Sequence, residues 1–68
     1  MKLSARNQIR GRITSIDLDG LMAEVTVDIG GSHTLISVIT RRSAEGMALR
    51  AGDEVTVVIK STEIMVAK

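Results

Sequence analysis

The chain has 68 residues, a formal net charge of +1, one histidine, and neither cysteine nor aromatic residues. This length allows a single domain, over residues 1–68, and the composition excludes a disulfide framework and a structural zinc site. The small net charge gives no strong field toward nucleic acids or acidic membranes, and the apolar runs are far shorter than the ~20 residues that span a bilayer.

The composition also predicts self-association. A domain below roughly 70–80 residues seldom gains more than about 3–5 kcal/mol from its core unless a disulfide, a metal or a partner subunit supports it. Although 44% of the residues are hydrophobic, no Phe, Tyr or Trp is available to fill an interior. We therefore expect an obligate homo-oligomer.

A long first strand is expected from about Leu3 to Leu18, with a turn at residues 17–20. A strand of sixteen residues at about 3.3 Å per residue would extend ~50 Å, whereas a compact domain of this size has a radius of gyration of about 11 Å. The strand must bend, most simply near Gly11, or extend onto a neighbouring subunit. This length predicts strands that are exchanged or shared between subunits.

The next two strands are predicted from their side-chain pattern. Apolar residues alternate with polar ones from Leu21 to Ile29, which is typical of a half-buried strand. Gly30 and Gly31 then predict a hairpin turn. The following segment, His33–Thr40, is rich in β-branched residues and apolar on both faces, so we expect it at a subunit interface or in a barrel interior.

A short helical turn is expected where the alternation stops, between Arg41 and Leu49. Ser43 is a candidate for its N-cap and Gly46 for its end. The segment 51–54 is then expected to form a turn.

Two further strands are predicted near the end of the chain, at Val55–Ile59 and Ile64–Ala67, with residues 60–63 as their connection. The count is then five strands and one helical turn. The predicted fold is all-β, a five-stranded Greek-key barrel of the OB type.

Two segments at opposite ends of the chain offer hydrogen-bond donors without a carboxylate. Residues 4–7 (Ser-Ala-Arg-Asn) and 60–62 (Lys-Ser-Thr) carry hydroxyls, cationic groups and turn amides. A fully deprotonated tetrahedral oxyanion has only acceptors, so a donor-only site suits it, whereas a carboxylate would repel it. Taken separately, each segment also fits a solvated strand start or a plain hairpin turn.

The same segments carry a family resemblance. Residues 4–8 (Ser-Ala-Arg-Asn-Gln) with Gly11, residues 52–55 (Gly-Asp-Glu-Val) and residues 58–65 (Val-Ile-Lys-Ser-Thr-Glu-Ile-Met) resemble the molbindin family, the small molybdate-binding Mop proteins with a TOBE/Mop-type domain. The resemblance covers essentially the whole chain, so residues 1–68 are expected to form one Mop domain.

The resemblance implies an OB-like barrel that assembles as a hexamer, a trimer of dimers, and holds molybdate or tungstate between subunits. It implies no organic cofactor and no direct cation ligand, because the metal is bound as its oxyanion. By resemblance, the oxyanion-binding residues at a subunit boundary are Ser4, Ala5, Arg6, Asn7, Lys60 and Ser61.

The predicted function is a cytoplasmic molybdate- or tungstate-binding protein for molybdenum storage or homeostasis, with no membrane partner. An enzyme is not expected, because the chain has no cysteine, a single histidine and no glycine-rich phosphate loop. One alternative is an OB-type nucleic-acid-binding module, which the lack of aromatic residues and of net positive charge disfavours. Another is a purely structural oligomerisation module.

Overall fold

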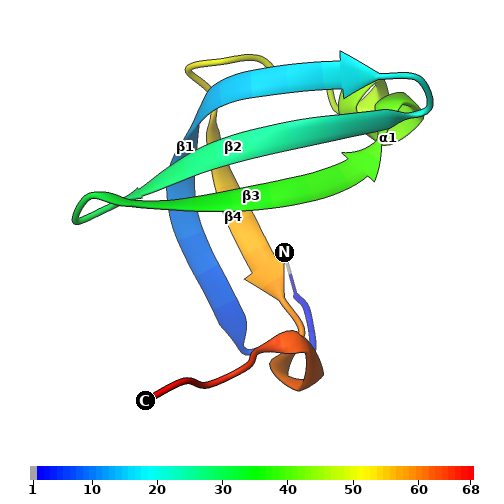
Figure 1. Cartoon of the computed structure of the whole chain (residues 1–68). Helices are drawn as coiled ribbons and strands as arrows, with labels where there is room; N and C mark the ends of the chain where they lie inside the picture. Colours follow the sequence, from blue (N-terminus) through cyan, green and yellow to red (C-terminus); the bar gives the residue numbers. More distant parts are fainter. Residues whose placement is uncertain (1) are drawn as a thin grey trace.

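The computed structural model describes residues 2–68, which form one curled antiparallel sheet with a short α-helix and a 3₁₀ turn (Figure 1). The strand order is β3-β2-β1-β4, so β4 returns to lie beside β1, which is the Greek-key order. Met1 lies outside the described residues, so the predicted domain is described from Lys2 onward. The elements are β1 (Asn7–Asp19), β2 (Met22–Gly30), β3 (His33–Thr40), α1 (Arg41–Gly46), β4 (Glu54–Ile59) and η1 (Ser61–Glu63).

Strand β1 bends because its two halves pair with different neighbours. Its first half, from Asn7 to Arg12, pairs with β4, and its second half pairs with β2. The register with β2 shifts between Ile13 and Ser15, a β-bulge of the kind that raises local twist. The predicted start at Leu3 is wrong, because the ladder with β4 begins only at Asn7.

Gly11 lies where β1 approaches β2 too closely for a side chain. A Cβ atom at this position would lie 2.5 Å from Cγ1 of Val27 and 2.8 Å from the carbonyl oxygen of Asp28. The strand curves in this region, as predicted, and the bulge follows immediately (Figure 1). Gly11 therefore permits the bend by leaving room for β2.

Two glycine-containing turns join the first three strands. Gly31 and Ser32 connect β2 to β3 with φ values of 61° and 63°, and a type I′ hairpin turn requires such a pair of positive values. Gly20, at φ 60°, begins the two-residue connection between β1 and β2. Both hairpin turns are present, but later than predicted: residues 17–19 belong to β1 and Gly30 belongs to β2.

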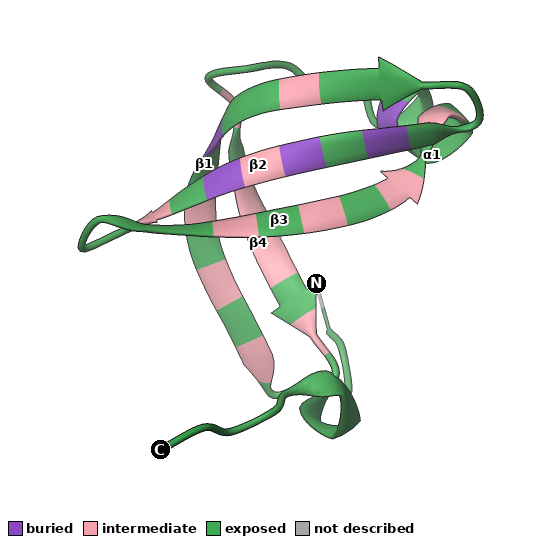
Figure 2. Ribbon diagram, in the orientation of Figure 1, coloured by how far each residue is buried: buried purple, intermediate pink, exposed green. Residues whose placement is uncertain are grey.

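The core is small and comes mainly from β2 (Figure 2). Ala23, Val25 and Val27 are 0–4% exposed, as the alternating pattern predicts, and Ile13 of β1 and Ala44 of α1 complete the buried apolar set. Five buried side chains of this size are few for an independent domain. The core thus agrees with the expectation that this chain needs further support.

Strand β3 has one open face within the single chain, and its place at a subunit interface stays a prediction. Its even-numbered side chains Ile36 and Val38 are 64% and 59% exposed, so only one face of the strand is covered within the chain. β3 is also one edge of the sheet, so its outer backbone groups have no strand beside them in this chain.

The predicted helical turn is present as α1, but its N-cap differs from the prediction. The N-cap of α1 is Thr40, whose Oγ1 accepts a hydrogen bond from the backbone N–H of Ser43 at 3.1 Å. The prediction of Ser43 as the cap is wrong, because Ser43 is the third helical residue and supplies the donor. The helix ends at Gly46, as predicted, but the left-handed residue beyond it is Ala48, at φ 52°.

Within one chain the sheet forms a half-barrel, so the predicted five-stranded barrel is present only in part: β3 and β4 are its two open edges. A cavity of about 280 Å³ lies between these edges, with Leu35, Ser37 and Val57 among its lining residues.

The predicted fifth strand at Ile64–Ala67 is absent from the part of the chain that is described. Met65 and Val66 are 94% and 92% exposed, and the segment leads away from the sheet after η1 (Figure 1). The described sheet consists of β3, β2, β1 and β4, and residues 64–67 pair with neither of its open edges, β3 and β4.

Candidate functional site

The β1–β4 ladder brings the two donor segments together. Its first pair joins Asn7 to Ile59. The last residue of segment 4–7 therefore lies beside the residue that directly precedes segment 60–61. Both segments lie at the same end of the sheet, close to the chain terminus marked N and to η1 (Figure 1). The two segments therefore lie side by side within one chain, and their predicted place at a subunit boundary stays a prediction.

A direct contact links the two segments. The side-chain amide of Asn7 donates to Oγ of Ser61 at 3.4 Å, a long and therefore weak hydrogen bond. Since Oγ of Ser61 accepts this bond, its own hydrogen remains free to donate to another acceptor. The backbone N–H of Glu63 donates to the carbonyl oxygen of Lys60 at 2.9 Å and closes the η1 turn around Ser61.

The site is an open surface with a positive character. Ala5 and Asn7 are half-buried, whereas Ser4, Arg6, Lys60 and Ser61 are exposed. Arg6 and Lys60 bring two cationic side chains, and no acidic residue lies within residues 2–8 or at positions 59–62. This arrangement offers hydroxyls, an amide and cations to an anion.

One contact in this region involves a residue outside the predicted set. The side-chain amide of Gln8 donates to the carbonyl oxygen of Ala5 at 2.8 Å. Gln8 belongs to the Ser-Ala-Arg-Asn-Gln motif, but a side chain that supports a loop, and does not itself point to a ligand, gives no separate signal in the sequence.

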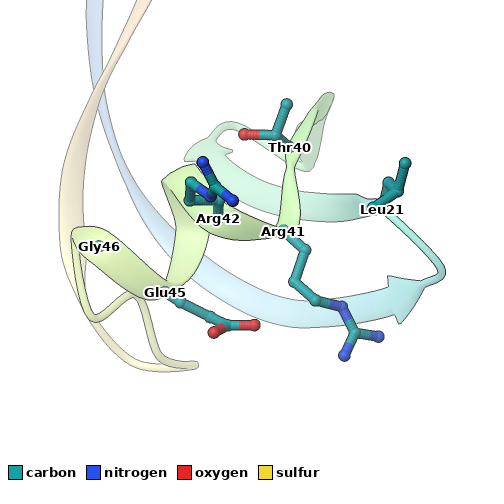
Figure 3. A pocket seen from close by; sticks show the side chains of 6 residues that line it. All are labelled: Leu21, Thr40, Arg41, Arg42, Glu45 and Gly46. Atoms are coloured by element: carbon teal, nitrogen blue, oxygen red, sulfur yellow. The ribbon is translucent and has the colours of Figure 1, made fainter.

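A second hollow, of about 770 Å³, lies beside α1 at the other end of the sheet (Figure 3). The side chains of Arg41 and Arg42 diverge at its wall, and Glu45 places a carboxylate beside them (Figure 3). Nε of Arg41 is buried without a hydrogen-bond partner. Because of the carboxylate, this hollow is not a donor-only site.

The described residues contain no group of three or more His, Cys, Asp or Glu side chains that could hold a metal ion. Over the same range, no helix has the length and apolar character needed to cross a bilayer.

The chain is similar to known proteins over nearly its full length. A model of the TOBE domain family matches residues 3–66. Molybdenum-pterin-binding protein 1 of Clostridium pasteurianum is 38% identical over 66 residues, which are 97% of this chain and 97% of that protein. The structure of a molybdate-binding protein from Sporomusa ovata matches with a TM-score of 0.94 and 35% identity, and the match covers 100% of both chains.

A third similar protein is longer. The structure of ModG with molybdate bound, described as a cytoplasmic molybdate-binding protein, matches with a TM-score of 0.85 and 31% identity. The match covers 90% of this chain and 43% of that chain.

Proposed function

We propose that this chain, which belongs to the TOBE domain family, is a cytoplasmic binding protein for molybdate or tungstate that serves molybdenum storage or homeostasis. The observation that carries the proposal is the contact between Asn7 and Ser61, which joins two carboxylate-free donor segments from opposite ends of the chain. Similarity to proteins described as molybdenum-pterin-binding, molybdate-binding and, for ModG, cytoplasmic supports the ligand class and the location.

The chemistry of the donors supports reversible binding and not catalysis. Molybdate is a tetrahedral dianion whose four oxygens only accept hydrogen bonds. The hydroxyls of Ser4 and Ser61, the backbone N–H groups of residues 4–7 and the cations of Arg6 and Lys60 match that demand. Hydrogen bonds to a charged group are stronger than neutral ones, so a few such donors give useful affinity without any metal ligand from the protein.

We further propose that the site is completed by a second subunit in a hexamer built as a trimer of dimers. Three features support subunit sharing: the half-barrel has two unpaired edges, β3 and β4; Ile36 and Val38 are exposed on β3; and the apolar residues 64–66 are exposed beyond η1. A tail strand from one subunit that pairs with an open edge of another would supply the fifth strand of the predicted barrel.

Isothermal titration calorimetry with molybdate, sulfate and phosphate tests the ligand. We expect molybdate to bind more tightly than the other two, and elemental analysis of the purified protein to detect molybdenum. Comparable weak binding of all three anions would contradict the selectivity.

A double variant tests the position of the site. Ser4→Asp combined with Ser61→Asp places two carboxylates beside the oxyanion and is expected to abolish molybdate binding. Native mass spectrometry, in which we expect the assembly to be largely intact, checks that lost binding does not reflect lost assembly. Normal molybdate uptake by this variant would mean that the site lies elsewhere.

A further inference from the structure

The hydrogen bond from Gln8 to Ala5 fixes the orientation of a peptide group at the proposed site. Nε2 of Gln8 donates to the carbonyl oxygen of Ala5 at 2.8 Å. In a planar trans peptide the C=O of one residue and the N–H of the next point in opposite directions. When the Ala5 carbonyl points toward Gln8, the Arg6 N–H must point away from it.

The direction of that N–H follows from the strand geometry. Asn7 and Gln8 are consecutive residues of β1, so their side chains leave the strand on opposite faces. The Asn7 side chain reaches Ser61 on one face, and the Gln8 side chain holds the Ala5 carbonyl on the other. The Arg6 N–H thus points away from the Gln8 side chain, and the contact between Asn7 and Ser61 lies on the face opposite to that side chain.

We propose that Gln8 is a positioning and specificity-determining residue, which keeps the Ala5–Arg6 peptide oriented so that the site presents the Arg6 N–H, and not the Ala5 carbonyl, to an oxyanion. This inference rests on the proposed oxyanion function. Gln8 acts through the backbone and does not touch the ligand.

The orientation matters because it decides which protonation state of an oxyanion fits. Molybdate and sulfate, being fully deprotonated, need only donors, whereas monohydrogen phosphate also carries an O–H that needs an acceptor. Loss of the Gln8 amide removes the hydrogen bond that holds the Ala5 carbonyl on its present side. A rotated peptide replaces one donor with one acceptor. Gln8 therefore disfavours phosphate relative to sulfate, an anion of similar size and equal charge.

The test compares Gln8→Met with the wild-type chain by calorimetry with molybdate, sulfate and monohydrogen phosphate. Methionine keeps the length of the side chain and removes the donor. The matched control is Thr14→Val, at a β1 residue away from the donor segments. It removes the hydrogen bond from Oγ1 of Thr14 to the backbone carbonyl oxygen of Thr26 on β2, at 3.4 Å.

We expect Gln8→Met to weaken molybdate and sulfate binding about tenfold, the effect of losing one hydrogen bond to a charged group. Phosphate binding should change less, so the ratio of phosphate to sulfate affinity should rise, by up to the same factor. Thr14→Val should leave both affinities and their ratio unchanged.

Three results separate the possible failures. If the wild-type chain binds no oxyanion, the proposed function is wrong and this role of Gln8 falls with it. If the wild-type chain binds molybdate and Gln8→Met binds all three anions as well as wild type, only the role of Gln8 is wrong. An equal loss for sulfate and phosphate would also overturn it, because it would show a general loss of structure and not a change of specificity.

A second measurement does not depend on the affinity of the variant. In wild-type protein the amide proton resonance of Arg6 should move downfield when molybdate is added, as expected for a new hydrogen bond to an anion. An Arg6 resonance that stays in place while neighbouring signals respond would overturn the proposed orientation.

Discussion

Replacement of Gly11 by alanine tests the close approach of β1 to β2 that permits the bend. The added Cβ would lie 2.5 Å from Cγ1 of Val27, 2.8 Å from the carbonyl oxygen of Asp28 and 3.2 Å from Cγ2 of Ile29. Val27 is 2% exposed and the Asp28 oxygen belongs to the backbone, so neither atom can move aside easily.

The expected magnitude is the difference between two effects. Overpacking of a well-packed region costs about 1–3 kcal/mol, and two immobile contacts favour the upper end of that range. Alanine recovers about 0.5–1 kcal/mol relative to glycine within a strand. The free energy of unfolding should therefore fall by about 2 kcal/mol, which corresponds to a Tm lower by roughly 10 °C for a domain of this size.

The assay is urea unfolding and thermal melting at one fixed protein concentration, because the stability of an oligomer depends on concentration. Gly46→Ala is the matched control, since a Cβ at Gly46 meets nothing within 4 Å and the residue lies in α1. That control should raise stability by up to about 1 kcal/mol. A Gly11→Ala protein as stable as wild type would refute the steric account of the bend.

Three other predictions follow from features of the same sheet. Thr40→Ala removes the N-cap of α1 and should lower the free energy of unfolding by about 1 kcal/mol in urea titrations; no change would mean that the cap is dispensable. Glu54→Gln breaks the ion pairs with Arg10 (3.0 Å) and Arg12 (3.3 Å), whose side chains are 60–76% exposed. Urea unfolding at low and high salt should therefore show that the free energy of unfolding falls by less than about 1 kcal/mol. A larger fall would mean that the ion pairs are shielded from solvent. Deletion of residues 64–68 removes no strand of the described sheet, and native mass spectrometry should show loss of the hexamer; persistent hexamers would contradict the proposed sharing of the tail.

The regular parts of the fold could be predicted because their signals are local. The alternation of β2 depends on burial of one face, and β2 carries three of the buried core residues. The hairpin between β2 and β3 depends on Gly31, whose positive φ few other residues adopt readily. Both signals act within a few residues and need no knowledge of the rest of the chain.

The features that could not be predicted depend on competition between nearby candidates or on distant partners. Thr40 and Ser43 both carry a cap-forming hydroxyl, and only the position of the last β3 pair, Met22 with Thr40, decides that Thr40 is the cap. The apolar run at residues 64–67 suits a strand, but a strand also needs an edge to pair with. Local sequence does not say which edges the chain leaves open.

The candidate site was predictable in its residue types and not in its internal contacts. The absence of carboxylates in residues 4–7 and 60–62 is visible in the sequence, and the structure brings these segments together. Two hydrogen bonds, from Asn7 to Ser61 and from Gln8 to the Ala5 carbonyl, depend on side-chain geometry at the start of β1. The sequence does not specify that geometry.

The contact between Asn7 and Ser61 has a thermodynamic consequence, because it joins residues 54 positions apart. The donor segments meet only while the terminal pair of the β1–β4 ladder, Asn7 with Ile59, stays closed. An oxyanion bound to both segments therefore binds the folded chain and not a frayed or unfolded one. By mass action the melting temperature must rise with the logarithm of free oxyanion concentration, so thermal stability itself reports how much oxyanion the protein meets.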